Sequence, residues 1–288
     1  MRHPDLAPPS LVNTGPPSTG STNGNGAFRA TDVLPVRVRP PASTSLRQLG
    51  VRVSVVIPTL NEAENLPHVL GRLPEGLHEV IVVDGHSSDD TVVIARHLRP
   101  DARVLLQTGH GKGNALATGF ADCTGDIVVT LDADGSTDAA EIPRFVAALC
   151  NGADFVKGSR FAQGGGSSDI TRVRRLGNRA LNSLVNNVYG TSYTDLCYGF
   201  NAFWRRCLPY MRVDCNGFEV ETLINVRIAK AGLVVHEVPS FEKDRLYGGS
   251  NLRAVRDGIR VLSTIGVERI SAAWPRSPLP RIARRLMP

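Results

Sequence analysis

VRVSVVIPTLNE (51–62) is a run of β-branched residues that ends in a polar turn, and it opens a repeating pattern. Four further apolar runs follow it: HEVIVVD (78–84), ARVLLQ (102–107), DIVVTLD (126–132) and ADFVKGS (153–159). Between them we expect helices at about 61–73, 89–98, 113–122 and 139–150, the first opened by Asn61 and Glu64 as a capping pair. Continuous apolar strands that alternate with helices predict an α/β fold with a mainly parallel sheet covered on both faces.

The regular alternation of apolar strands and helices ends after residue 159. Two Gly-rich segments, FAQGGGSSDI (161–170) and KDRLYGGSN (243–251), are typical of loops. Further elements are expected in this half: helices at 172–188, 219–231 and up to about 270, and strands at 199–204 and 233–239.

The two ends of the chain differ from its middle in composition and charge. Residues 1–50 are dominated by Pro, Gly, Ser, Thr and Asn, which predicts a disordered tail before a folded domain over 51–270. The net charge of +6 divides into +3 in residues 1–50, −1 in 51–270 and +4 in the basic tail 271–288. A neutral folded domain argues against a nucleic-acid enzyme, whereas basic tails suit contact with an anionic surface.

Composition also limits the compartment. The chain has 288 residues, 42% of them hydrophobic and 21% charged, as in ordinary globular proteins. No apolar run approaches the ~18 residues that a membrane span needs, and no secretory h-region is visible. Five cysteines without a C-x-x-C pair fit a reducing, cytoplasmic compartment. We therefore expect a cytoplasmic protein, with peripheral membrane contact through the basic tails if it acts on lipid.

Two segments at strand ends are candidates for phosphate and metal binding. GHGKGN (109–114) fails both the dinucleotide and the P-loop pattern, which leaves either a plain turn or one whose amides and Lys112 meet a phosphate. LDADGS (131–136) places Asp132 and Asp134 after a buried strand, on the same side of the chain. Paired carboxylates there are suited to Mg²⁺ or Mn²⁺ held together with substrate phosphates. Asp84, at the end of another strand, is placed to accept hydrogen bonds from a nucleobase or ribose.

Taken together, the motifs resemble family 2 glycosyltransferases. VVIPTLNE (55–62), VVDGHSSDDT (82–91), GKGNAL (111–116), LDADGS (131–136) and GSRF (158–161) stand in that family's order. DLCYGFNAFWR (195–205), EVPSF (237–241) and R-x-x-G-x-S (245–250) are similar to its polyprenyl-phosphate mannosyl- and glucosyltransferase branch. The resemblance implies a GT-A fold, an αβα sandwich that binds a nucleotide.

The resemblance also implies site residues. A first group would contact the donor: Pro58, Thr59, Asn61, Glu62, Asp84, Lys112, Asp132, Arg245 and Ser250. Asp132 and Asp134 would hold Mg²⁺ or Mn²⁺, and Arg160 would hold a phosphate of the donor or acceptor. The chain departs from the branch at Ser136, where Gln is common, and at Asn251, where Lys is common.

The function expected from this resemblance is inverting, metal-dependent transfer of a hexose from GDP-mannose or UDP-glucose to a polyprenyl phosphate. A sugar or small-molecule hydroxyl is the alternative acceptor, and it requires a general base. Glu219 in GFEVET (217–222) is a candidate for that base. Glu221 in the same segment is interpreted more readily as a helix cap or a solvated residue. A non-catalytic nucleotide-sugar binder on the same fold is the alternative of another class. The presence of Asp132, Asp134 and Arg160 favours the enzyme.

Overall fold

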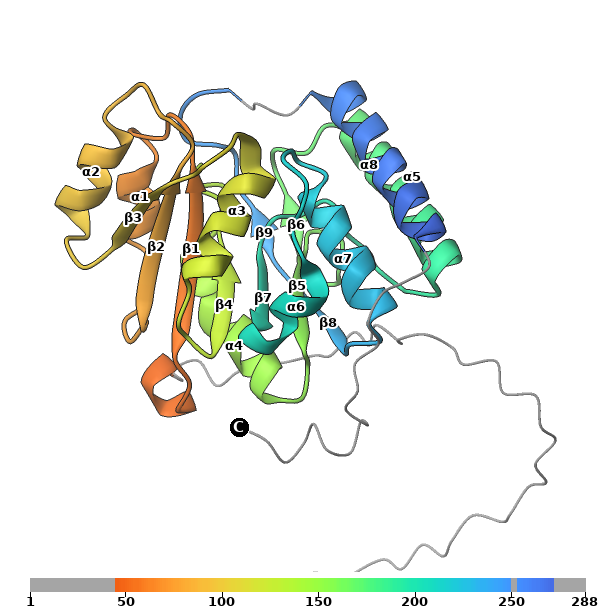
Figure 1. Ribbon diagram of the computed structural model, residues 1–288, viewed down its shortest axis with the longest axis horizontal. Coiled ribbons are helices and arrows are strands. Elements are labelled where there is room, and N and C mark those ends of the chain that lie inside the picture. Colours follow the sequence, from red (N-terminus) through yellow and green to blue (C-terminus); the bar gives the residue numbers. More distant parts are fainter. Residues whose placement is uncertain (1–44, 250–252, 272–288) are drawn as a thin grey trace, which may run out of the picture.

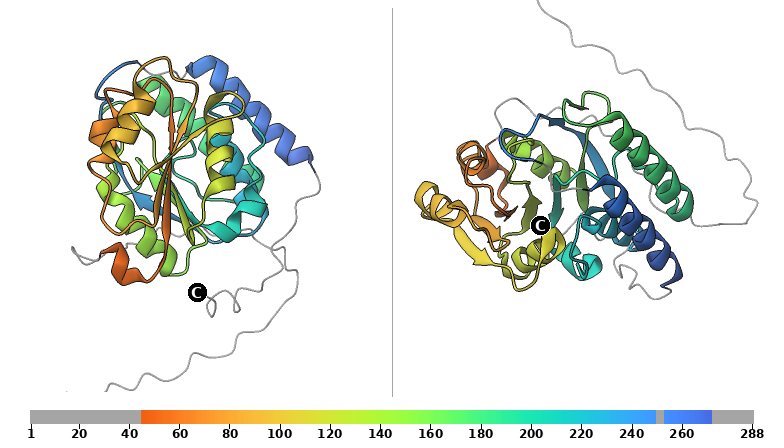
Figure 2. Two further views of the ribbon diagram at one scale, coloured as in Figure 1. Left: turned by 60° about the vertical axis from the view of Figure 1, so that its left-hand side comes forward. Right: turned by 90° about the horizontal axis from the view of Figure 1, so that it is seen from above.

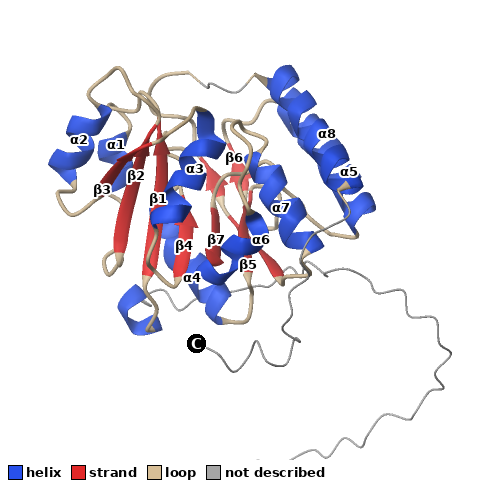
Figure 3. Cartoon of the chain, viewed as in Figure 1, coloured by secondary structure: helices blue, strands red, loops and turns tan. Residues whose placement is uncertain are grey.

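The computed structural model describes residues 45–249 and 253–271. These residues form the predicted α/β sandwich (Figures 1 and 3). Its sheet has the order β3-β2-β1-β4-β7-β5-β8, and only β7 runs antiparallel to its neighbours among the described strands. The strands of this sheet are β1 (Val53–Thr59), β2 (Glu79–Asp84), β3 (Arg103–Leu106), β4 (Ile127–Thr130), β5 (Phe155–Ser159), β7 (Asn201–Trp204) and β8 (Val235–Pro239).

The helices lie on both faces of the sheet (Figure 2). They are α1 (Leu66–Leu70), α2 (Thr91–Leu98), α3 (Gly111–Asp122), α4 (Ile142–Cys150), α5 (Arg172–Tyr189), α6 (Leu208–Met211), α7 (Val220–Lys230) and α8 (Ala254–Ile270). Side chains of β1 alternate between two apolar clusters: Val55 and Ile57 pack with α1 and α4, and Val56 packs with α3 and α7. This alternation explains why the central strands read as continuous apolar runs.

One side of the molecule has an additional helical layer. Residues 220–229 of α7 are all buried, because α5 and α8 lie side by side over it (Figures 1 and 2). Its buried residues include polar ones, Glu221, Thr222, Asn225 and Arg227, as well as apolar ones. α5 and α8 therefore form the outer surface on this side.

The structure corrects the start of the first helix. Asn61 lies in the left-handed region with φ 55°, and its side-chain oxygen accepts a hydrogen bond from the Ser88 amide at 2.8 Å. The helix begins at Leu66 instead, with Asn65 at its N-cap and Pro67 in its first turn. Proline favours a helix start, because it has no amide to leave unpaired.

Two boundaries also differ from the prediction. A 3-10 helix at Leu46–Leu49 precedes β1, and Leu46 is 1% exposed, so the ordered chain begins before residue 51. The two segments predicted as loops contain or flank short parallel strands, β6 (Gly166–Ser167) and β9 (Phe241–Glu242). No described helix is long and apolar enough to cross a membrane. Both predicted tails fall almost entirely outside the described residues.

Candidate active site

A cleft of about 620 Å³ opens at the edge of the sheet where the parallel strands end. Ligands bind at this edge in open α/β sheets. Eight predicted site residues line the cleft: Pro58, Thr59, Glu62, Lys112, Asp132, Asp134, Arg160 and Arg245. The structure thus brings together residues that are almost 190 positions apart in the sequence.

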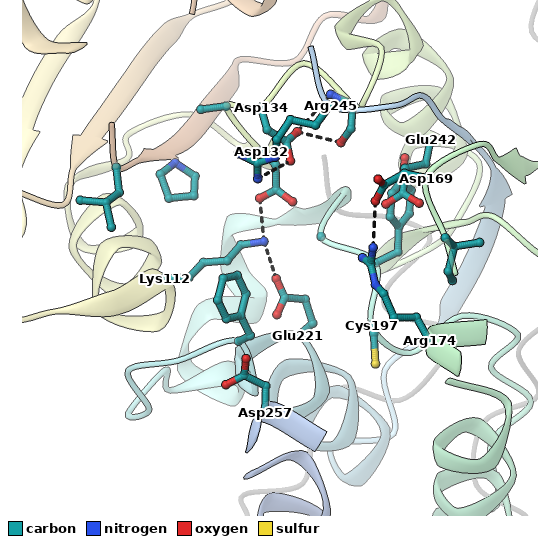
Figure 4. A pocket seen from close by; sticks show the side chains of 18 of the residues that line it. Lys112, Asp132, Asp134, Asp169, Arg174, Cys197, Glu221, Glu242, Arg245 and Asp257 are labelled. Atoms are coloured by element: carbon teal, nitrogen blue, oxygen red, sulfur yellow. Dashed lines mark hydrogen bonds and ion pairs between the residues drawn. The ribbon is translucent and has the colours of Figure 1, made fainter. Parts of the chain in front are cut away.

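Asp132 and Asp134 are each paired with a cation of the chain (Figure 4). Lys112 Nζ lies 2.6 Å from Asp132 Oδ1, and Arg245 Nη2 lies 3.0 Å from Asp134 Oδ2. Ser136 holds the other Asp134 oxygen, with its amide at 3.0 Å and its hydroxyl at 2.7 Å. The two carboxylates are therefore oriented and neutralised without a ligand.

Lys112 also contacts Glu221, whose Oε1 lies 2.7 Å from the ammonium group (Figure 4). Burial alone would lower the pKa of Lys112, but the carboxylates of Asp132 and Glu221 outweigh it and raise that pKa. The lysine is thus a fixed positive charge between two acids. Glu221 comes from the first turn of α7, so this ion bridge joins α3, the segment after β4, and α7.

Arg245 closes one side of the cleft. Besides Asp134 it contacts Glu62, with Nη1 3.1 Å from Oε1. Burial raises the pKa of Glu62, although hydrogen bonds from Asn65 and Arg245 counteract it. The same loop is fixed at Tyr247, whose amide donates to Asn65 Oδ1 at 3.0 Å and whose carbonyl accepts from Asn65 Nδ2 at 3.2 Å. The loop after β9 is therefore docked on the segment between β1 and α1.

The glycines of GKGN serve close packing. A Cβ on Gly111 would lie 2.1 Å from the Asn216 carbonyl oxygen, and one on Gly113 would lie 2.2 Å from that of Cys215. Gly111 also has φ +84°, which favours glycine. The Gly113 amide donates to the Asn216 carbonyl at 3.0 Å, so this amide is not free for a phosphate. The close backbone contact with Cys215 and Asn216 is enough to explain the glycines of this turn. Of the two interpretations, the plain turn is therefore the one that accounts for them.

Arg160 differs from its predicted role. All three of its guanidinium nitrogens donate to carboxylates, two to Asp195 at 2.7 and 2.9 Å and one to Glu242 at 3.0 and 3.1 Å. The group is 4% exposed and lies 4.9 Å from the ring centre of Tyr198. These partners make Arg160 a structural cation at the cleft wall, and a phosphate contact would have to compete with two buried carboxylates.

Asp84 lies at the end of β2, next to Gly85, which lines the cleft. It is 2% exposed; Oδ2 accepts from the Ser87 amide at 3.0 Å, whereas Oδ1 has no partner among the described residues. Gln107, which lines the cleft and was not predicted, also has a buried side-chain oxygen without a partner there. Buried acceptors are normally paired. The oxygen of Gln107, which lines the cleft, is suited to a donor from a ligand.

Three predicted residues that the structure describes, Asn61, Asp84 and Glu219, are not on the cleft wall. Asn61 lines a smaller neighbouring pocket, and Ser250 lies outside the described residues. Glu219 turns back on its own loop, where Oε1 accepts from the Gly217 amide at 3.0 Å. Glu221 takes the place in the cleft that was expected for Glu219. Either residue fits the first turn of a helix, so the sequence pattern alone does not separate the two.

The carboxylate oxygens of Asp132 and Asp134 suit a hard divalent ion that is bound together with a ligand. Asp132 Oδ2 has no hydrogen-bond or ion-pair partner among the described residues, and the side chain, which lines the cleft, is 31% exposed. No group of three or more His, Cys, Asp or Glu with metal-binding geometry occurs in the described part of the chain. Mg²⁺ or Mn²⁺ at these two aspartates would therefore complete its shell with diphosphate oxygens and water.

The fold and this acidic cleft define the class of protein. It is a GT-A-like protein, of the kind that uses nucleotide-sugars. The family model "Glycosyl transferase family 2" matches residues 54–209, and we conclude that the chain belongs to this family and is a glycosyltransferase. Glycosyltransferase AglJ of Haloferax volcanii is 35% identical over 211 residues, which cover 72% of this chain and 68% of AglJ.

Two further similarities concern a bacterial relative and a solved fold. The undecaprenyl-phosphate 4-deoxy-4-formamido-L-arabinose transferase of Enterobacter sp. is 30% identical over 71% of this chain and 64% of its own length. Glucosyl-3-phosphoglycerate synthase of Mycobacterium tuberculosis, solved with Mn²⁺, UDP and glucosyl-3-phosphoglycerate, has a TM-score of 0.65 at 24% identity, covering 87% of this chain and 96% of that one. The second similarity shows the shared fold.

Proposed function

We propose that the enzyme transfers a hexose from a nucleoside-diphosphate sugar, GDP-mannose or UDP-glucose, to a polyprenyl phosphate with inversion at the anomeric carbon. The observation that carries the proposal is the shape of the cleft. It begins at the aspartate pair at the sheet edge and continues into a slot between α5 and α8. The polar half of the cleft suits a charged donor, and the apolar half suits the hydrocarbon chain of the acceptor.

The donor half is lined by polar groups suited to a nucleotide. Gln107, which lines the cleft, and Asp84, whose neighbour Gly85 lines it, each have an unpartnered oxygen among the described residues that would accept from N–H or O–H groups of the base and ribose. Asp132 and Asp134 lie where a diphosphate would be neutralised, and the solved Mn²⁺–UDP complexes of the similar fold support a divalent ion there. When bound, such an ion stabilises the negative charge of the leaving diphosphate.

The chain's own cations assist the same step. Arg245 reaches Asp134 from a surface loop, and Lys112 reaches Asp132 from α3. Both are positioned to exchange a carboxylate partner for a diphosphate oxygen when the donor binds. Because these donors are fixed before binding, little reorganisation is needed as charge develops.

The acceptor half is apolar. Val173 and Leu181 of α5 and Val255 and Val261 of α8 line the slot, as does Arg174, which pairs with Asp169 at 2.8 Å. A phosphate monoester with a second pKa near ~6 is already dianionic at neutral pH. Its oxygen can attack the anomeric carbon without a general base. The name of the Enterobacter relative supports this acceptor class.

A hydroxyl acceptor is the second candidate, because Glu221 provides a carboxylate in the cleft. Such an acceptor requires a base in the transition state. Glu221 lies closer to that role than Glu219, which does not line the cleft. The two candidates therefore differ in their dependence on Glu221.

The test uses labelled GDP-mannose or UDP-glucose, Mg²⁺ or Mn²⁺, and either a polyprenyl phosphate or a panel of hydroxyl acceptors. The expected result is metal-dependent label in the organic phase, lost in Asp134→Asn and retained in Glu219→Gln. Label that reaches only hydroxyl acceptors would overturn the lipid-phosphate proposal. Glu221→Gln would then be expected to abolish transfer.

A further inference from the structure

The outer surface of α8 is unusually apolar for a helix at the edge of a globular protein. Its buried side carries Asp257 and Glu268, only 7% and 4% exposed, together with Val261 and Ile265. Its large apolar side chains instead point outward: Val255 (79% exposed), Ile259 (63%), Leu262 (51%), Val267 (61%) and Ile270 (84%). The helix thus exposes five large apolar side chains to solvent while it buries both of its acids, which departs from the usual amphipathic pattern.

The neighbouring helix α5 extends this surface. Val173, Leu176 and Leu184 are 74%, 70% and 37% exposed, and they recur at the spacing of one helical stripe. Figure 2 shows α5 and α8 side by side on the outside of the molecule. We call the eight exposed apolar residues of these two helices the α5–α8 face. Clustered exposed apolar residues mark an interaction site more often than scattered ones do.

The charges around the α5–α8 face have a single sign. α5 contains no acidic residue, and both acids of α8 point inward and are buried. The exposed charged residues of the two helices are all arginines: Arg172, Arg175, Arg179, Arg256, Arg260 and Arg269. The basic excess therefore lies on a face of the folded domain as well as in the terminal segments. Apolar residues surrounded by arginine are typical of helices that lie in the interface of an anionic bilayer.

The α5–α8 face is continuous with the cleft. Val173 and Val255, which belong to this face, also line the slot between the two helices. A polyprenyl chain is insoluble in water, so an acceptor held in a bilayer would have to enter the cleft without crossing solvent. A membrane on this face would bring it to the slot directly.

A second copy of the chain is a poorer occupant of the same face. In a two-fold symmetric contact the same patch meets itself, so arginines would face arginines. Like charges placed against each other oppose association, whereas anionic lipid headgroups would neutralise them. The segment 272–288, which follows α8, carries four arginines and no acid, so it has the same sign as the face.

We propose that the α5–α8 face docks on an anionic lipid bilayer and that the acceptor enters the cleft between α5 and α8. The inference rests on the proposed lipid-phosphate function and specifies how that substrate is reached. It assigns membrane contact to the folded domain, where the sequence pointed to the terminal tails.

The test is sedimentation of the full chain with vesicles of phosphatidylcholine alone or mixed with phosphatidylglycerol. We expect binding to the anionic vesicles, weakened by salt because headgroup attraction is screened. Ile259→Ser/Leu262→Ser should weaken that binding by about ten-fold or more, since it removes two apolar side chains from the buried interface. The matched control is Val93→Ser/Leu106→Ser, two apolar residues that are 64% and 59% exposed on α2 and β3. It should change binding less than about two-fold on the same grounds.

The inference is overturned if the wild-type chain does not bind anionic vesicles, or if both double variants lose vesicle binding to the same extent. It is also overturned if light scattering reveals a dimer that Ile259→Ser/Leu262→Ser dissociates while vesicle binding is unchanged. Transfer to a short-chain, water-soluble polyprenyl phosphate tests the proposed function separately. The α8 variant should retain that transfer; if the wild-type chain lacks it, the proposed function fails whatever the vesicles show.

Discussion

Arg160 holds two acids from different parts of the chain, Asp195 and Glu242, at the wall of the cleft. Removing one partner of a buried ionic group leaves the others without compensation, at a cost of about 3–5 kcal/mol. We therefore expect Arg160→Met to lower the free energy of unfolding by about that amount. Denaturant unfolding measures it. Arg52→Met is the control, because Arg52 and Asp126 are 52% and 39% exposed and solvent screens their pair, so its loss should cost much less.

A different outcome would restore the role predicted for Arg160. If Arg160→Met keeps wild-type stability but loses transfer activity, its guanidinium binds substrate phosphate and the structural assignment is wrong.

Gly199 sits against the centre of the site. A Cβ there would lie 2.6 Å from Asp132 Oδ2 and 2.8 Å from Lys112 Nζ. Both are ends of flexible side chains, so Gly199→Ala should displace them without unfolding the protein. Misplacement of a catalytic group by about 1 Å costs up to about 100-fold in rate, and we expect a 10–100-fold fall in kcat/KM with a nearly unchanged melting temperature. A fully active variant would show that these two side chains do not act at the reaction centre.

Single residues also mark the limit of sequence reasoning at this site. Asp132 and Asp134 could be located because they follow a buried strand. Glu221 could not be separated from Glu219 by pattern alone, since either fits the first turn of a helix. The partners of Arg160 lie 35 and 82 positions away, and no local spacing indicates such pairs.

Among the elements, β1, β2 and β3 are tied together by Glu79, at the edge of the sheet opposite the cleft. It accepts from the Ser54 hydroxyl and the Thr124 amide, both at 2.6 Å, and from Arg103 at 3.0 Å. Burial alone would raise the pKa of Glu79, but these hydrogen bonds outweigh it and lower that pKa to about 2.

A carboxylate with a lowered pKa stabilises the folded state above its unfolded pKa, and that stability is lost as pH falls. The contribution of Glu79 should therefore be complete above about pH 5 and disappear between pH 4.5 and 2. Glu79→Gln should cost about 1 kcal/mol at pH 7. It should also flatten the acid limb of the curve of unfolding free energy against pH, with transfer activity per folded molecule unchanged. An identical pH curve in the variant would refute this role.

The order of helices and strands was predictable because parallel strands buried on both faces stand out as apolar runs. The antiparallel direction of β7 was not, because a strand's sequence does not record the direction of its neighbours. Two-residue strands such as β6 are too short to leave a pattern. The start of α1 was misplaced because Asn61 has the composition of a cap but contacts Ser88 in a left-handed conformation.

For the whole molecule, donor and metal should bind together. Asp132 and Asp134 would hold the ion, and because the described residues contain no group of three or more potential metal ligands, the remaining ligands would come from the diphosphate and water. UDP or GDP with Mn²⁺ should raise the melting temperature, whereas either alone should do so weakly. At a hundred-fold excess over Kd the stabilisation is about 2.7 kcal/mol. Scanning calorimetry measures it, and Asp132→Asn should abolish the combined effect. A full shift with nucleotide alone would exclude joint binding.

Transfer of the sugar to a lipid phosphate can be followed by ³¹P NMR. A short-chain polyprenyl phosphate is incubated with the enzyme, Mg²⁺ and GDP-mannose or UDP-glucose, and its phosphorus signal is followed. We expect the phosphomonoester resonance to be replaced by that of a phosphodiester as nucleoside diphosphate appears, and Asp134→Asn to leave it unchanged. Consumption of donor with an intact monoester resonance would exclude the lipid phosphate as the acceptor.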